Sequence, residues 1–139
     1  MTPPEIIKKL QEIYDIKISR TTLLRYERQG LIPKPTRGAG GQVVGRWTQY
    51  PDETIAEAYA SWCLQNGKYE KNYKKHLNSL SQISPEYIKE ARKTYYFKKP
   101  FQHDTTLESL ESIKTVYDLF VFGTWKYHYE YALKEGANH

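Results

Sequence analysis

The chain has little of what several common protein classes need. It holds one cysteine, Cys63, in 139 residues, which excludes an intramolecular disulfide and argues against metal sensing through several thiolates. The apolar residues around Cys63 predict a buried, inert thiol. No apolar run approaches the roughly 20 residues that a membrane-spanning helix needs. A secretory signal is not visible either, so we expect a cytoplasmic protein without a membrane partner.

Catalytic and cofactor motifs are also missing. We find no HExxH, Walker or Rossmann sequence, and therefore predict that the chain is not an enzyme and needs no cofactor. Glu108 and Glu111 form the one tempting carboxylate pair, but the N-terminus of a helix favours such residues without catalysis. The four histidines lack the spacing of metal ligands, so we predict no metal site and expect surface positions for His76, His103, His128 and His139.

Positive charge is concentrated in two parts of the chain. Residues 1–52 carry a net charge of +4 and residues 67–103 carry +6, whereas residues 53–66 and 104–139 carry −2 and −3. Such asymmetry favours an anionic partner, and nucleic acid fits it better than a membrane surface. The lysines in residues 68–75 either extend the contact with that partner or form a solvated face.

The first thirty residues predict two short helices joined by a tight turn. Thr2 and a glutamate three residues later have the spacing of a capping box, and apolar residues then recur at helical intervals over residues 3–14. Ser19 can cap a second helix over residues 20–29, and Gly30 can end it in the left-handed conformation. Two such helices are typical of a helix-turn-helix motif.

Residues 34–51 consist of β-prone residues around a glycine-rich centre. They predict a β-hairpin with Gly38, Gly40 and Gly41 in a loose tip. A phosphate-binding loop is the alternative for these glycines. It would need a helix directly behind them, and the strand-like residues that follow argue against one.

The remainder of the chain predicts helices. Acidic residues after Pro51 can start a helix that ends at Asn66-Gly67, and Ser84 can cap another over residues 85–96. A capping pattern then precedes a long helix over residues 105–135. Because the middle of this helix is apolar nearly all round, we expect it to form the centre of a small helical bundle rather than a bare coiled coil.

Residues 18–35, ISRTTLLRYERQGLIPKP, precede the glycine-rich hairpin and the segment YPDETIAEA. In this order they resemble the DNA-binding domain of the MerR family of bacterial transcription regulators. The resemblance covers about residues 3–65 and departs at Leu24, where the family carries a phosphate-binding arginine. The residues that match the family's motif are Thr22, Leu23, Tyr26, Glu27, Gly30, Leu31, Ile32, Pro33 and Tyr50.

The resemblance implies a recognition helix in the major groove of double-stranded DNA and a hairpin that acts as a wing on the flanking backbone. Arginine suits either contact, because its planar fork binds guanine edges or phosphate oxygens. Tyr26 has a structural alternative, since its ring could complete the core instead. The implied DNA-binding residues are Arg20, Thr21, Thr22, Arg25 and Tyr26 on the helix and Arg37 and Arg46 on the wing.

We therefore predict a mainly α fold, with an N-terminal winged helix-turn-helix and small β-hairpin wing, followed by a C-terminal helical region that ends in a long helix. Residues 1–66 would form the DNA-binding domain, and residues 67–139 a dimerisation or effector region. The resemblance implies a homodimer, matched to two half-sites. The aromatic residues of the second region either line a cavity for a small-molecule effector or form core and interface.

The leading functional hypothesis is a sequence-specific transcriptional regulator. The alternative is an architectural or mobile-element accessory factor, similar to an excisionase, that uses the same winged domain to shape DNA. Footprinting distinguishes them, because the first predicts one promoter operator and the second predicts repeated sites or marked bending.

Overall fold

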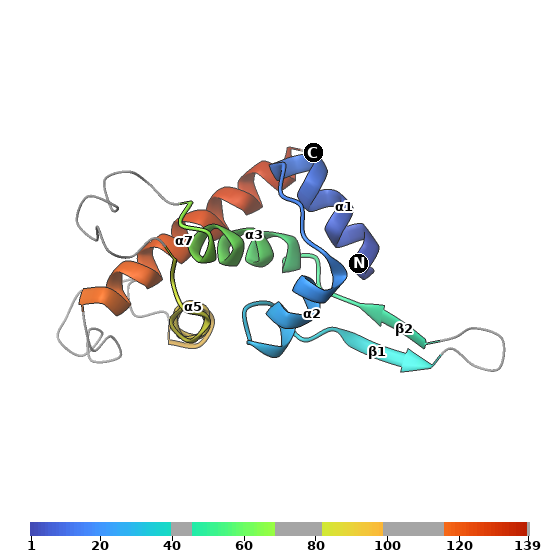
Figure 1. Cartoon of the computed structure of the whole chain (residues 1–139), viewed down its shortest axis with the longest axis horizontal. Coiled ribbons are helices and arrows are strands. Elements are labelled where there is room, and N and C mark those ends of the chain that lie inside the picture. Colours follow the sequence, from blue (N-terminus) through green and yellow to red (C-terminus); the bar gives the residue numbers. More distant parts are fainter. Residues whose placement is uncertain (40–45, 69–81, 99–115, 139) are drawn as a thin grey trace.

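The computed structural model describes residues 1–39, 46–68, 82–98 and 116–138 (Figure 1). These residues are mainly helical and include a small two-stranded antiparallel sheet and a long C-terminal helix, which confirms the expected class at this level. The elements in chain order are α1 Pro3–Tyr14, α2 Arg20–Arg28, β1 Thr36–Ala39, β2 Arg46–Gln49, α3 Thr54–Gln65, α5 Pro85–Lys93, the π-helical turn η1 Thr94–Lys98 and α7 Val116–Ala137.

The first two helices begin at the expected capping residues, and α2 ends at the expected glycine. The Thr2 hydroxyl accepts a hydrogen bond from the backbone N–H of Glu5 at 3.3 Å, and the Ser19 hydroxyl accepts one from the N–H of Thr22 at 3.1 Å. Each side chain thus satisfies an N–H that its helix leaves without an internal partner. Gly30 follows α2 with φ +75°, a left-handed conformation that residues with a side chain rarely adopt.

The hairpin pairs Thr36 with Gln49 and Gly38 with Trp47. Gly38 was expected in the loop at the tip, and this prediction was wrong, because Gly38 lies within β1. A Cβ there would approach Trp47 Cζ2 to 2.5 Å, so the glycine makes room for the indole across the strand pair. Gly40 and Gly41 lie outside the described residues.

The C-terminal helices differ in extent from the sequence prediction. The helix expected over residues 85–96 keeps its α-form to Lys93 and then continues as η1 to Lys98. The long helix is described from Val116 to Ala137. The predicted start of that helix, near residue 105, and the lysines after Lys68 lie outside the described residues.

The helices α3 and α7 pack along each other, α5 packs against α7, and α1 packs against both α2 and α3 (Figure 1). The hairpin of β1 and β2 projects away from this helical body. One set of buried side chains joins α1, α2 and α3 and includes Ile6, Leu10, Leu23, Tyr26 and Leu64. The recognition helix of the prediction is therefore seated on α1 and α3 by its apolar face.

Two predictions about single side chains have opposite outcomes. Cys63 is 3% exposed, which confirms that the thiol is buried, and burial raises its pKa to about 12, a shift that disfavours the reactive thiolate. His128 was expected at the surface but is buried on α7, and burial lowers the pKa of its imidazole to about 4. The prediction for His128 failed because histidine spacing does not reveal which face of a helix is buried when the helix is apolar nearly all round.

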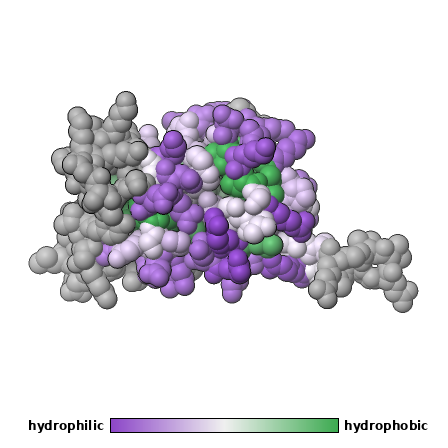
Figure 2. All heavy atoms as spheres, in the orientation of Figure 1, coloured by the Kyte–Doolittle hydropathy of each residue, from purple (hydrophilic) through white to green (hydrophobic). Residues whose placement is uncertain are grey.

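On the face shown in Figure 2, hydrophilic residues cover most of the described surface, with small hydrophobic areas between them. Within the described ranges, no helix combines the length and the apolar composition that crossing a membrane requires.

Candidate nucleic-acid interface

The exposed side of α2 carries most of its positive charge. At about 100° per residue, positions 20, 24, 28, 21 and 25 cover an arc of about 140°, and all five of these residues are exposed. Leu23 and Tyr26 lie on the opposite side, with 0% and 1% of their surface exposed. The helix thus presents one continuous face to solvent, formed by Arg20, Thr21, Leu24, Arg25 and Arg28, which we call the α2 face.

The α2 face contains three arginines and no acidic residue. The one carboxylate of α2, Glu27, lies at the edge of this face, toward the hairpin. Its Oε2 accepts a hydrogen bond from Arg37 Nη1 at 2.9 Å, and its Oε1 accepts one from Arg37 Nη2 at 2.7 Å. Because Arg37 pairs with the carboxylate, Glu27 does not offset the three arginines of the face.

Tyr50 completes the link between α2 and the hairpin. Its hydroxyl donates to Glu27 Oε1 at 2.8 Å, so one carboxylate holds a residue within β1, Arg37, and the residue that follows β2. The hydrogen bonds from Arg37 lower the pKa of Glu27. Burial and the bond to Glu27 raise the pKa of Tyr50 to about 12. The carboxylate therefore stays charged, and the hairpin is attached to α2 at a defined position.

The role of Glu27 was missed in the sequence. The sequence identified Glu27 only as a match to the family's motif, beside Tyr26, and that match gave no partner for the carboxylate. The sequence signal that could have found the link is the pair Arg37 and Tyr50, which lie at the two outer ends of the predicted hairpin. Strand pairing brings those ends together next to α2.

The structure places the predicted site residues in four settings. Arg20, Thr21 and Arg25 are exposed on the α2 face. Arg37 lies beside that face, bound to Glu27, with 48% of its side chain exposed. The backbone of Arg46 begins β2, but its side chain lies outside the described residues.

Thr22 and Tyr26 face away from the centre of the α2 face. The Thr22 hydroxyl accepts a hydrogen bond from the Ser19 hydroxyl at 3.1 Å at the start of the helix. Tyr26 is 1% exposed, and burial raises the pKa of its hydroxyl to about 12. This burial favours the alternative in which the Tyr26 ring completes the core.

A second arginine–carboxylate pair lies inside the helical body. Glu57 of α3 is 0% exposed and accepts a hydrogen bond from Nε of Arg92 on α5. The Arg92 guanidinium also lies over the Tyr96 ring, 5.5 Å from its centroid. Burial raises the pKa of Glu57 to about 7, although Arg92 acts to lower it. This pair joins α3 to α5, with the carboxylate fully buried and the guanidinium partly exposed.

The aromatic residues of the C-terminal region pack against one another. The Trp125 and Tyr129 rings stack with centroids 4.9 Å apart, and the Tyr95 ring meets both edge-on. The Tyr96 hydroxyl donates to the Tyr129 hydroxyl at 2.5 Å. The π-helical turn η1 brings Tyr95 and Tyr96 to α7, and the contacts favour core packing over an effector cavity in this cluster.

Among the residues that the structure describes, no three histidine, cysteine, aspartate or glutamate side chains gather as ligands for a metal ion. Comparisons with protein-family models, with curated proteins and with solved structures gave no match. The functional assignment accordingly rests on the residues of this chain and their geometry.

Proposed function

We propose that the protein is a cytoplasmic, sequence-specific transcriptional regulator of MerR-like type, which binds double-stranded DNA without a catalytic step or a cofactor. In this proposal α2 enters the major groove and the hairpin contacts the flanking backbone, as in a winged helix-turn-helix. The observation that carries it is the α2 face, where three exposed arginines occur without an exposed carboxylate.

Four side chains of the α2 face have a chemistry suited to DNA. Arg20 and Arg25 can bind guanine edges or phosphate oxygens through two parallel hydrogen bonds. Thr21 can donate to a phosphate oxygen or a base edge. Leu24, which is 41% exposed, can contact the methyl group of thymine, a role that its apolar character permits on a solvent-facing helix.

The attachment of the hairpin supports its assignment as a wing. Glu27, Arg37 and Tyr50 hold it against α2, while the strands project beyond the helical body (Figure 1). A projecting hairpin beside a recognition helix can follow the DNA backbone next to the groove that the helix occupies. Arg46 at the start of β2 is placed by the backbone on this hairpin.

A homodimer is part of the proposal, with α7 as the interface. Leu119, Tyr127 and Tyr131 are exposed on α7 at spacings of eight and four residues, and Gly123 continues the same row. Apart from its chain neighbours and the nearby backbone of α7 itself, no atom of the described residues lies within 4 Å of a Cβ built on Gly123, so a second helix could approach closely there. A Tyr127→Lys substitution should shift the protein toward monomer in sedimentation-velocity measurements.

Selection of bound duplexes from a random DNA library tests the proposal. We expect one enriched motif with two related half-sites, and affinity that falls steeply as salt concentration rises. Enrichment without a shared motif would contradict sequence-specific regulation. Repeated sites with marked bending in a subsequent footprint would favour the architectural or mobile-element factor.

A further inference from the structure

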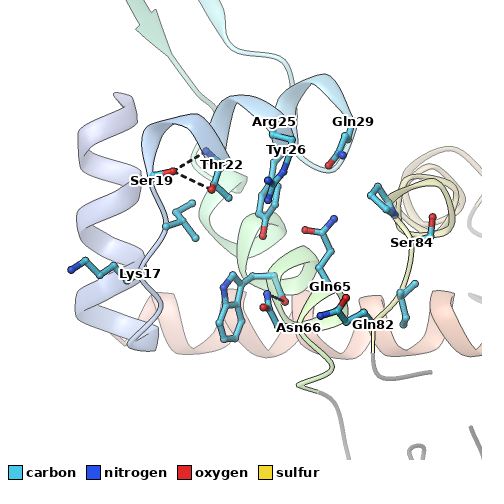
Figure 3. Close-up of a pocket in the computed structure, with 14 residues that line it drawn as sticks. Lys17, Ser19, Thr22, Arg25, Tyr26, Gln29, Gln65, Asn66, Gln82 and Ser84 are labelled. Carbon is cyan, nitrogen blue, oxygen red and sulfur yellow. Dashed lines mark hydrogen bonds between the residues drawn. The ribbon is translucent and has the colours of Figure 1, made fainter. Parts of the chain in front are cut away.

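An open pocket of about 680 Å³ lies beside the α2 face. It is bounded by α2, by the C-terminal end of α3 and by the segment that enters α5 (Figure 3). Its volume falls within the range of roughly 300–1,000 Å³ that is typical of small-molecule sites. The residues that line it are Lys17, Ile18, Ser19, Thr22, Arg25, Tyr26, Gln29, Trp62, Gln65, Asn66, Gln82, Ile83, Ser84 and Pro85.

The lining is cationic and rich in carboxamides. None of the described residues that line the pocket is an aspartate or a glutamate. Figure 3 shows the Lys17 amino group directed away from the other labelled side chains, so Arg25 supplies the positive charge at the pocket. The carboxamides come from three separate elements of the chain and belong to Gln29, Gln65, Asn66 and Gln82.

The polar groups converge on the same space. In Figure 3 the Tyr26 hydroxyl and the Gln65 carboxamide point toward each other inside the pocket, at the junction of α2 and α3. Gln29 Oε1 is buried and has no hydrogen-bond partner among the described residues. A buried acceptor without a partner is costly.

Trp62 adds a flat apolar surface to this polar lining. Its side chain is half-buried at the end of α3 and borders the pocket. An indole stacks well on other planar rings, while carboxamides read the donors and acceptors along the edge of such a ring. Arginine at the same pocket binds a phosphate group through paired hydrogen bonds.

We propose that this pocket binds a mononucleotide, with the base against Trp62 and the carboxamides and the phosphate at Arg25. No residue of the Glu27, Arg37 and Tyr50 link lines the pocket, so the site is distinct from the attachment of the hairpin. The binding site itself does not depend on the DNA-binding proposal.

A regulatory consequence follows if that proposal also holds. Arg25 belongs both to the pocket and to the α2 face, and one guanidinium cannot bind the nucleotide phosphate and DNA in full at the same time. Nucleotide binding would therefore weaken DNA binding, and DNA would weaken nucleotide binding by the same factor.

Nuclear magnetic resonance titration without DNA tests the site. The chain has three tryptophans, and a Trp62→Phe variant assigns the Trp62 indole signal. We expect AMP, GMP, CMP or UMP to shift that signal together with the Gln29 and Gln65 carboxamide signals. Inorganic phosphate and the free nucleosides should bind at least about tenfold more weakly, because phosphate lacks the base and the nucleosides lack the phosphate group.

Matched variants separate the pocket from general electrostatics. Arg25→Ala should weaken mononucleotide binding about tenfold, whereas Arg28→Ala, which removes an exposed α2 arginine outside the pocket, should leave it unchanged. Gln65→Ala should weaken it and Gln49→Ala should not. Unchanged unfolding midpoints confirm that each variant is folded.

Three results would overturn the proposal. These are no shift of the Trp62 signal with any of the four mononucleotides at millimolar concentration, equal effects of Arg25→Ala and Arg28→Ala, or shifts that occur only with duplex DNA. The last result would make the pocket part of the DNA contact and would leave the proposed function intact.

Discussion

Two arginine–carboxylate pairs hold elements of this protein together in opposite surroundings. Glu27 and Arg37 join α2 to the hairpin, with 14% and 48% of their side chains exposed. Glu57 and Arg92 join α3 to α5, with 0% and 18% exposed. The pKa of Glu27 is lowered by its partner, whereas burial raises the pKa of Glu57 to about 7.

The difference shows that water, rather than the identity of the partner, decides what each pair does. At the edge of the α2 face the charged Glu27 carboxylate keeps contact with water, so it orients the hairpin with a small desolvation free energy. Inside the body the same chemistry carries a desolvation penalty, which the arginine offsets only in part. The first pair serves the proposed DNA-binding surface, and the second holds the helices that support it.

Loss of the buried arginine should have the largest effect. Arg92→Ala removes the cation and hydrogen-bond donor of Glu57, so the buried carboxyl takes up a proton, and the free energy of unfolding should fall by about 1–3 kcal/mol at neutral pH. Denaturant unfolding measures this change, with Lys93→Ala as the control for an exposed cation on the same helix. Equal effects of the two substitutions would show that Glu57 does not depend on Arg92.

Loss of an arginine from the α2 face should leave folding intact and weaken DNA binding. We expect Arg25→Ala to cost about 1–3 kcal/mol in binding free energy, with reduced discrimination at one base position if the side chain reads a base. Fluorescence anisotropy with the selected duplex measures it, and Lys134→Ala on α7 is the charge-matched control. If Arg25→Ala and Arg46→Ala both bind normally at low salt, this assignment of residues is wrong.

The two glutamates should respond to pH in opposite directions. The folded pKa of Glu57 exceeds its ordinary value of 4.5, so its contribution to stability is complete below about pH 4.5 and is lost as pH rises through about 7. The folded pKa of Glu27 is below 4.5, so its contribution is present above that pH and is lost on acidification.

Unfolding of Glu57→Gln and Glu27→Gln across pH 3–8 tests this contrast. Relative to the unsubstituted protein, Glu57→Gln should gain stability as pH rises from about 4.5 to 7, and Glu27→Gln should gain as pH falls below about 4.5. The contribution of His128, with its pKa lowered to about 4, is common to all three proteins and cancels in the differences. If the difference in unfolding free energy from the unsubstituted protein followed the same pH dependence for both variants, the contrast between the buried and the exposed pair would be contradicted.

The smallest effect on global stability should come from the exposed pair. Arg37→Ala should change the unfolding midpoint less than any substitution above, because water replaces the guanidinium around Glu27. It should instead loosen the hairpin, which hydrogen exchange of the β1 and β2 amides would detect as faster exchange. An unfolding midpoint lowered as much as in Arg92→Ala would contradict this ranking.

Local signals explain how far the sequence predicted the fold. The caps at Thr2 and Ser19 and the stop at Gly30 act within one helical turn, so their residues alone located α1 and α2. The position of Gly38 in β1 depends on the Trp47 ring across the hairpin, a contact that glycine content does not reveal.

The candidate site was predictable only in part for the same reason. The α2 face follows from helical periodicity, once Leu23 is taken as buried. The Glu27 link needs three residues from separate elements, and the burial of Glu57 and His128 depends on how α3, α5 and α7 pack. Such long-range contacts leave no periodic signal in one sequence.

The salt dependence of duplex binding tests the central claim most directly. It should be measured with the selected duplex for the unsubstituted protein and for a variant with Arg20, Arg25 and Arg28 replaced by glutamine. The control replaces three exposed lysines on other helices, Lys8, Lys93 and Lys134. In the arginine variant, we predict that the magnitude of the negative slope of log affinity against log salt decreases by about one for each DNA phosphate that α2 no longer neutralises. In the lysine control, we predict an unchanged slope. Equal slopes for the two variants would contradict the assignment of α2 as the DNA-binding helix.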